Sequence, residues 1–198
     1  MRIIAGKYRS RRLHGPKGLS LRPTSDRLRE SLFDVLAEFV DGSRFFDAFA
    51  GTGAVGIEAL SRGAKEVIFL ENHAPAVNLI KKNLALLEAN RGVRVLPVDA
   101  LRGLRTLTKE NLPAHEQQEI LFLDPPYDHA ADYDHVLSFL GSATLLSENS
   151  LVIAEHRRNF ELAEVVKNLQ RVRVLRQGDA ALSFYRLRKS SASEWVSP

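Results

Sequence analysis

The chain has 198 residues, of which 44% are hydrophobic and 26% are charged, a size and balance typical of one soluble globular domain. It contains no cysteine, which excludes disulfides, thiolate metal sites and a cysteine nucleophile, and its six histidines form no pair with metal-ligand spacing. The formal net charge is +4 and no apolar run approaches the roughly 20 residues that cross a bilayer, so we expect a metal-free cytoplasmic protein.

The positive charge is concentrated at the start of the chain. Residues 1–30 carry nine Lys and Arg against two acidic residues, a balance of +7, so the remainder sums to −3. A basic arm on a slightly acidic body is typical of a polyanion binder, although a solubilising surface hairpin would have the same composition. Lys7, Arg9 and Arg11 alternate, so a strand would place all three on one face. The candidate phosphate-binding residues are Lys7, Arg9, Arg11, Arg12, Arg22 and Arg27.

A helix is predicted to follow the basic segment. Thr24-Ser25-Asp26 offers capping oxygens, an apolar stripe at helical spacing runs from Leu28 to Phe39, and Asp41-Gly42 ends it. We expect residues 1–40 to form a β-hairpin and helix extension that packs on a core at 41–189. Residues 190–198 are Ser-rich and are expected to be a disordered tail.

Strand and helix patterns alternate from residue 41 onward. This alternation predicts an α/β fold with a largely parallel sheet and helices on both faces. Strands are predicted at 44–49, 66–71, 93–98, 119–124 and 150–156, and helices at 54–62, 74–89, 99–107, 132–140 and 159–168. Gly178-Asp179 predicts a hairpin between two final strands at 172–177 and 181–188.

A glycine-rich loop joins the first core strand to the first core helix. Gly51 and Gly53 permit a tight turn and let backbone N–H groups approach a ligand closely. Twenty residues after Gly51, the next apolar run ends in Glu71, whose carboxylate can accept from a ribose diol. The same spacing occurs in dinucleotide-binding dehydrogenases. However, Asp47 lies just before the turn, where a carboxylate disfavours a pyrophosphate and suits a cationic amino group, and no hydride-transfer apparatus follows.

The fourth core strand ends in Asp124-Pro125-Pro126-Tyr127, at the end where open α/β sheets bind ligands. Two prolines hold the chain stiff without a helix. The Asp and proline carbonyls can accept from an amino group, and Tyr127 offers a face on which a planar base can stack. The run therefore suits a flipped base with an exocyclic amino group, although a proline turn with a half-buried tyrosine is the simpler alternative.

Together these segments resemble the class I S-adenosylmethionine-dependent methyltransferases that modify base amino groups through an (Asn/Asp)-Pro-Pro-(Tyr/Phe) motif. MRIIAGKYR at 1–9, RPTSDR at 22–27, FAGTG at 49–53 and GIEALSRGA at 56–64 are similar to the RsmD family, whose members methylate N2 of one guanine in bacterial 16S ribosomal RNA. The similarity covers residues 1 to 188 and departs at Ala48, where the family usually has Leu. It implies a Rossmann-like, mostly parallel seven-stranded sheet with an antiparallel last strand.

The resemblance also assigns roles to residues. Asp124, Pro125, Pro126 and Tyr127 would hold the target base. S-adenosylmethionine would contact Asp47, Ala50, Gly51, Thr52, Gly53, Glu71, Asn72, Asp99 and Ala100. Asp99 would accept from the adenine amino group, although it also suits the cap of the following helix. The implied partner is 16S ribosomal RNA, free or in a partly assembled small subunit, and we expect a monomer without membrane contact.

Several alternatives stay open. An adenine-N6 methyltransferase of DNA or RNA would use the same Asp-Pro-Pro-Tyr chemistry, although no separate target-recognition domain accompanies it. A non-catalytic ribosome-assembly factor would bind RNA without needing Asp124, and a small-molecule methyltransferase would not need the basic arm. Glu155-His156, at the end of the fifth core strand, is interpreted as a structural pair, and Asn83 is assigned to the surface.

Overall fold

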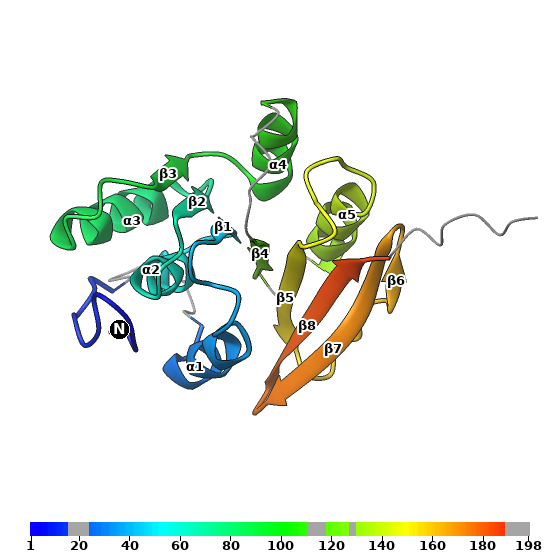
Figure 1. Ribbon diagram of the computed structural model, residues 1–198, viewed down its shortest axis with the longest axis horizontal. Coiled ribbons are helices and arrows are strands. Elements are labelled where there is room, and N and C mark those ends of the chain that lie inside the picture. Colours follow the sequence, from blue (N-terminus) through cyan, green and yellow to red (C-terminus); the bar gives the residue numbers. More distant parts are fainter. Residues whose placement is uncertain (16–23, 111–117, 127–129, 189–198) are drawn as a thin grey trace, which may run out of the picture.

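The computed structural model describes residues 1–15, 24–110, 118–126 and 130–188, so Arg22, Tyr127 and the predicted tail lie outside the described residues. Across the described ranges, one eight-stranded sheet runs through the centre of the protein (Figure 1). No described helix is both long and apolar enough to cross a bilayer. The elements are α1 (Asp26–Val35), β1 (Arg44–Ala48), α2 (Ala54–Ser61), β2 (Glu66–Leu70), α3 (Ala74–Leu86), β3 (Val93–Leu96), α4 (Ala100–Lys109), β4 (Glu119–Leu123), α5 (Ala130–Leu140), β5 (Leu151–Arg157), β6 (Val165–Val166), β7 (Leu169–Gln177) and β8 (Ala180–Leu187).

The strand order is β3-β2-β1-β4-β5-β8-β7-β6. Strands β1 to β5 are parallel, and β8 is inserted antiparallel between β5 and β7, which confirms the Rossmann-like arrangement. Ala48 pairs with both Leu70 and Leu123, so β1, β2 and β4 end at the same edge of the sheet. Strands β2 and β3 lie on one side of β1, whereas β4 and β5 lie on the other, so the strand order switches between β1 and β4. Open α/β sheets bind ligands at such switch points.

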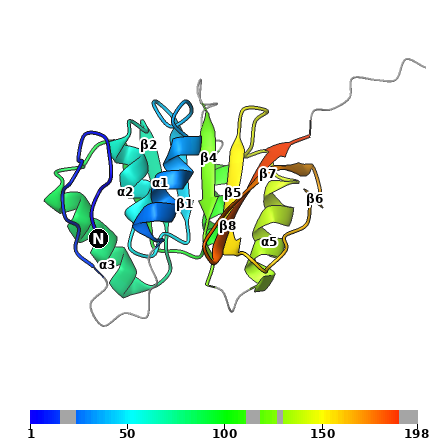
Figure 2. The same ribbon diagram turned by 90° about the horizontal axis from the view of Figure 1, so that it is seen from below.

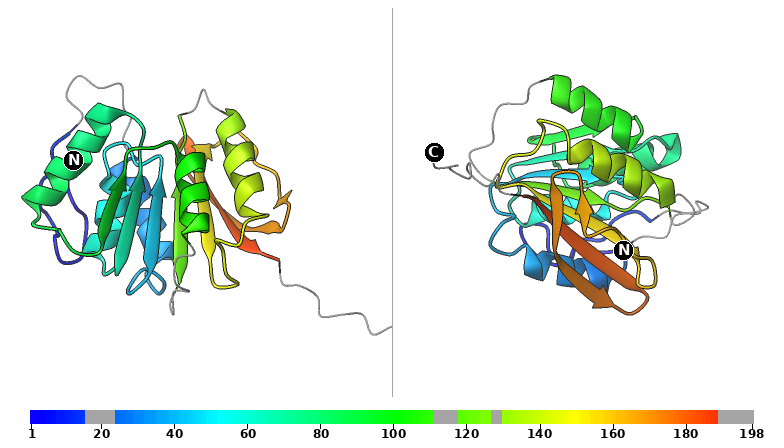
Figure 3. Two further views of the ribbon diagram at one scale, coloured as in Figure 1. Left: turned by 90° about the horizontal axis from the view of Figure 1, so that it is seen from above. Right: turned by 90° about the vertical axis from the view of Figure 1, so that its right-hand side faces the viewer.

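Helices cover both faces of the sheet, as Figure 3 shows. Helices α1, α2 and α3 pack on one face against residues such as Phe45 and Ile120, while α4 and α5 pack on the other against Phe46 and Leu121. Side chains alternate between faces along a strand. Because both faces are covered, β1 and β4 are buried along their whole length, which explains their continuous apolar runs.

The basic extension is a loop rather than the predicted hairpin of strands. It lies beside α2 and α3 (Figure 2), and we call residues 1–14 the N-terminal loop. An isolated antiparallel bridge joins Arg2 to Arg12, but residues 5–10 form bends and turns. Only the two ends of the loop pair with each other, as the N–H of Ile3 donates to the carbonyl of Arg11 at 3.0 Å. Between these ends no strand forms, because the N–H of Lys7 donates to the carbonyl of Ser61 in α2 at 2.6 Å and that of Arg9 closes a turn onto Gly6 at 3.1 Å. The buried side chains that dock the loop are Ile3, Tyr8 and Leu13.

The helix predicted at 159–168 is wrong, and β6 lies there instead. The Arg171 guanidinium donates to the carbonyl of Leu162 at 2.7 Å, and the Tyr185 hydroxyl donates to that of Ala163 at 2.8 Å. These contacts engage carbonyls that a helix would use for its own hydrogen bonds. The short pair with β7 then makes the sheet eight-stranded, over the described residues, rather than seven-stranded. The predicted final hairpin is confirmed, with Gly178 at φ 58° in its turn.

Candidate active site

A pocket of about 750 Å³ opens at the carboxyl ends of β1, β2, β4 and β5. Its volume lies within the roughly 300–1,000 Å³ of small-molecule sites. It brings together residues that the sequence assigned to two different ligands and that are far apart in the chain. The predicted residues in its lining are Asp47, Ala50, Gly51, Thr52, Glu71, Asn72, Asp99, Ala100, Asp124, Pro125 and Pro126.

The glycine loop after β1 depends on backbone that other residues rarely adopt. Gly51 has φ 52° and Gly53, the N-cap of α2, has φ 74°. Gly56 has a different role, because a Cβ there would lie 2.4 Å from Cε1 of Phe69. The absence of a side chain at Gly56 therefore lets α2 pack closely on β2, which fixes the loop beside the pocket.

Asp47 is buried beneath this loop. It is 2% exposed, and its Oδ2 accepts from the N–H of Gly56 at 2.8 Å. Burial raises the pKa of Asp47 to about 7; the Gly56 hydrogen bond opposes this shift, and repulsion from Glu71 adds to it. A cationic group bound beside Asp47 would favour its ionised form, so the site suits a ligand that carries an amino group.

Glu71 is anchored at the end of β2. Its two carboxylate oxygens accept from the N–H groups of Gly51 and His73, each at 2.7 Å. Each oxygen keeps a further lone pair that can accept from a ligand hydroxyl. At the end of the β3–α4 connection, Asp99 accepts from the N–H of Arg102 at 2.9 Å, which confirms its predicted capping role. Glu71 is thus fixed in place beside the glycine loop.

Asp124-Pro125-Pro126 continues directly from the end of β4 into the pocket wall. Asp124 is half-buried, Pro125 is buried and Pro126 is exposed. The prolines restrict the backbone here, which places Asp124 and the Pro125 carbonyl, both potential acceptors, beside the switch point. The predicted stacking residue, Tyr127, lies outside the described residues.

The sequence did not predict that the segment before α1 would form part of this pocket. Thr24 and Ser25 line it, together with Leu28 in the first turn of α1, and the hydroxyl of Thr24 donates to Oε2 of Glu155 at 3.0 Å. Ser25 also caps α1, as predicted, by accepting from the N–H of Leu28. Thr24 and Glu155 are 131 positions apart, so no local pattern signals their contact.

In the pair Glu155-His156, the histidine is buried against β8 and the glutamate lines the pocket. His156 is buried, and its Nε2 lies 2.9 Å from the hydroxyl of Ser183 on β8. Burial lowers the pKa of His156, so the neutral ring is favoured. Its structural interpretation therefore fits, whereas Glu155 lines the pocket.

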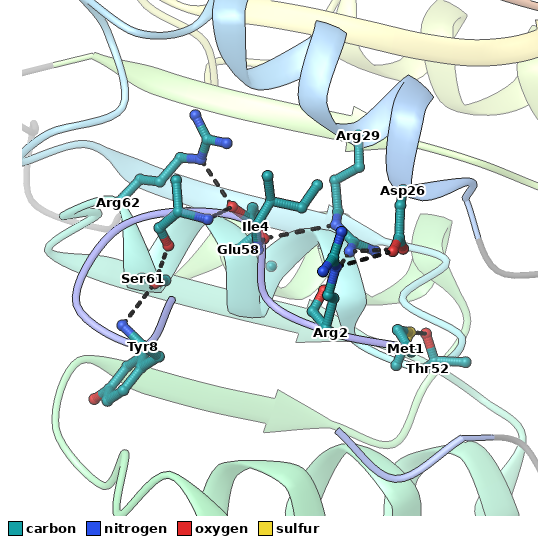
Figure 4. A network of polar contacts seen from close by, with 12 residues as sticks. Met1, Arg2, Ile4, Tyr8, Asp26, Arg29, Thr52, Glu58, Ser61 and Arg62 are labelled. Atoms are coloured by element: carbon teal, nitrogen blue, oxygen red, sulfur yellow. Dashed lines mark hydrogen bonds and ion pairs between the residues drawn. The ribbon is translucent and has the colours of Figure 1, made fainter. Parts of the chain in front are cut away.

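The N-terminal loop is fixed by a buried carboxylate that the sequence analysis missed (Figure 4). Glu58 of α2 is fully buried and accepts from the N–H groups of Ile4 and Ala5 at 2.8 and 3.0 Å. Its carboxylate also pairs with Arg62 at 2.9 Å and with Arg29 at 3.6 Å. Glu58 thus ties the loop to both α1 and α2.

Basic residues near the start of the chain therefore differ in whether their side chains are exposed to solvent. Arg29 is 1% exposed and bound within this network, so it is not a surface cation. Arg27 is exposed on α1. The exposed side chains that we call the loop cations are Lys7, Arg9, Arg11 and Arg12. Asn83, assigned to the surface, is instead fully buried and accepts from the N–H of His14 at 2.8 Å, which holds the end of the loop on α3.

Comparison with known proteins places the whole architecture in one family. The family model described as "Conserved hypothetical protein 95" matches residues 1–186. The ribosomal RNA small subunit methyltransferase D of Haemophilus influenzae is 37% identical over 163 residues, which cover 82% of this chain and 81% of that protein. The chain belongs to the RsmD family. The Escherichia coli K12 protein of the same name is 32% identical over 194 residues, covering 98% and 93% of the two chains.

Solved structures agree with this membership. The E. coli protein yhhF has a TM-score of 0.78 at 32% identity, covering 96% of this chain and 99% of that one. A Thermus thermophilus protein has a TM-score of 0.75 at 30% identity, covering 93% and 98%. The RsmD-family chain is therefore a methyltransferase with a Rossmann-like class I fold.

Proposed function

We propose that this RsmD-family protein transfers a methyl group from S-adenosylmethionine to N2 of a guanine in small-subunit ribosomal RNA. The carrying observation is that the glycine loop, Glu71 and Asp124-Pro125-Pro126 line one pocket at the switch point of the sheet. The names of the relatives support ribosomal RNA of the small subunit as the substrate. A protein of the same fold, SMU.776, was solved in complex with SAH at 13% identity and a TM-score of 0.64.

The pocket residues fit S-adenosylmethionine on chemical grounds. Glu71 would accept from the ribose hydroxyls, and Asp47 would face the amino group of the methionine part. Asn72 and Asp99, at the ends of β2 and β3, would contact the adenine. The buried carboxyl of Asp47, whose pKa is raised to about 7, is the observation that favours a cationic ligand over a pyrophosphate. When bound, S-adenosylmethionine supplies a methyl group that its sulfonium already activates.

The chain's own residues would then mainly orient the base. The guanine N2 lone pair is delocalised into the ring, so the amino group is a weak nucleophile. Hydrogen bonds to Asp124 and to the Pro125 carbonyl would favour a pyramidal nitrogen whose lone pair is aligned for in-line attack at about 3–3.5 Å. The new nitrogen–carbon bond would form as the carbon–sulfur bond breaks to leave the demethylated cofactor, and Asp124 or water would take the N2 proton.

The RNA would be held outside the pocket. A base must leave its stack to reach Asp124, and Tyr127 would replace the lost stacking. The loop cations, with Arg22 and Arg27, would contact phosphates without sequence preference. Selectivity for one guanine would then come from RNA shape, free or in a partly assembled subunit. We expect the protein to act as a monomer.

Two measurements test the proposal. Mass mapping of small-subunit RNA from a deletion strain, before and after treatment with the purified protein and S-adenosylmethionine, should reveal one guanine that gains an N2 methyl group. A methylated adenine would instead support the adenine-N6 alternative. Isothermal titration should show binding of S-adenosylmethionine and of its demethylated product; tight binding of NAD without either would overturn the cofactor assignment.

A further inference from the structure

Glu155 lies beside Asp124, although no sequence motif marks it. Strands β4 and β5 are parallel neighbours in which Leu123 pairs with Ala154, so the next residues, Asp124 and Glu155, lie side by side. The residues two positions earlier in each strand belong to the core cluster on the α1 face. Side chains two positions apart in a strand lie on the same face of the sheet, so Asp124 and Glu155 also lie on the α1 face. Both line the pocket, so the pocket wall holds two adjacent carboxylates.

Glu155 is held in place at both its side chain and its backbone. The Thr24 hydroxyl donates to its Oε2 at 3.0 Å, and the Tyr133 hydroxyl of α5 donates to its backbone carbonyl at 2.6 Å. The residue is 5% exposed, so its position is set by packing rather than by solvent. A carboxylate offers about four lone-pair positions, so one that accepts from a protein group can accept from a ligand as well. Glu155 can therefore act as an oriented acceptor for a ligand in the pocket.

The place of Glu155 in the sheet puts it on the base side of the pocket. The strand order gives a row of carboxylates at successive strand ends: Glu71 after β2, Asp47 in β1, Asp124 after β4 and Glu155 in β5. Glu71 and Asp47, the proposed cofactor contacts, are the first two residues of this row. Glu155 is the last, next to Asp124, which would hold the amino group of the base.

We propose that Glu155 recognises the base by accepting the N1–H of the target guanine while Asp124 accepts from the N2 amino group. The inference rests on the proposed function and specifies how its substrate is chosen. Guanine presents two neighbouring donors on this edge, N1–H and the N2 amino group. Adenine presents one amino group beside a bare N1 acceptor, which an ionised carboxylate repels. Two adjacent carboxylates thus select guanine over adenine.

The test uses 2-aminopurine, which keeps the amino group at C2 but has an unprotonated N1. Single-turnover methylation is measured on small-subunit RNA that carries either guanine or 2-aminopurine at the mapped position. The wild-type protein should prefer guanine roughly 10- to 100-fold, the discrimination typical of a specific base contact. The amide of Glu155→Gln can donate to a bare N1, so this variant should shift the preference toward 2-aminopurine by a similar factor.

The preference is the ratio of the rates on the two RNAs, both measured with the same protein preparation. Partial unfolding of a variant lowers both rates by the same factor and so does not change this ratio. Glu161→Gln, a matched change at an exposed position shortly after β5, should keep the wild-type ratio. If Glu155→Gln lowers both rates equally, or changes neither, Glu155 does not recognise the base and the inference is overturned. If the wild-type protein methylates neither RNA, the proposed function itself fails.

Discussion

Asp47→Asn should separate the stability of the fold from cofactor binding. Burial raises the pKa of Asp47 from an ordinary 3.8 to about 7. At about 1.4 kcal/mol for each unit between the unfolded and native pKa, ionised Asp47 costs the native state about 4 kcal/mol above pH 7. Asparagine has nearly the same shape, carries no charge and can still accept from the N–H of Gly56. The substitution should therefore raise the free energy of unfolding at alkaline pH.

The pH dependence gives the sharper test. Because native Asp47 keeps its proton to a higher pH than the unfolded chain does, the native state binds more protons between about pH 4 and 7. The wild-type protein then loses stability as pH rises through this window. The advantage of Asp47→Asn should grow by about 1.4 kcal/mol per pH unit and level off above pH 7, a difference of about 2 kcal/mol between pH 5.5 and 8.5.

Urea unfolding followed by circular dichroism at the two pH values measures this difference. Asp34→Asn removes the same charge from an exposed position on α1 and should change stability by less than about 0.5 kcal/mol at both. An equal effect of Asp47→Asn at pH 5.5 and 8.5 would refute the raised pKa. In isothermal titration the same variant should bind S-adenosylmethionine more weakly by roughly 1.5–3 kcal/mol, the scale of a hydrogen bond to a charged group.

Three further predictions concern the other parts of the site. Glu71→Ala should weaken cofactor binding by roughly 1.5–3 kcal/mol in isothermal titration; unchanged affinity would remove Glu71 from the cofactor site. Replacing all loop cations by Gln should flatten the salt dependence of RNA binding by somewhat under one unit of log–log slope per lost phosphate contact, with cofactor affinity unchanged. An unchanged slope would mean that the loop cations do not contact RNA phosphates. Asp124→Ala should nearly abolish single-turnover methyl transfer while sparing cofactor affinity, and a wild-type rate would refute its catalytic role. Asp124→Asn should keep partial activity if orientation dominates, or lose about 10²–10⁴-fold if proton acceptance does.

Features that depend on local sequence were predicted well. The apolar runs at β1 and β4, the glycine loop and the acidic residues at strand ends all follow from residues close together in the chain, and the structure places them at one edge. The errors have a common cause in contacts between distant residues. The predicted helix at 159–168 fails because Arg171 and Tyr185 bind its carbonyls, and the predicted basic strand fails because Glu58 and Ser61 bind its N–H groups.

The pocket wall shows the same limit within the site. Asp124 could be singled out because the two prolines mark it. Glu155 could not, because its neighbours become apparent only when β5 is placed beside β4 and Thr24 reaches it across 131 positions. Asn83 likewise resembles any polar residue on a helix until the end of the N-terminal loop is seen to lie against it. A single sequence carries no signal for such pairings.

The distribution of charge explains how a polyanion could be bound while its base alone enters the site. Carboxylates at the ends of β2, β1, β4 and β5 line the pocket, so phosphate groups are disfavoured there, whereas base donors and a cationic sulfonium are favoured. The loop cations lie outside this lining on a loop that Glu58 anchors, and Met1 of that loop contacts the pocket residue Thr52, whose hydroxyl lies 3.5 Å from its sulfur. If the protein acts as proposed, RNA affinity and base chemistry would depend on charges of opposite sign in adjoining regions. Because exposed charges are screened by salt and buried ones much less so, added salt should weaken RNA binding far more than it weakens the contacts inside the pocket.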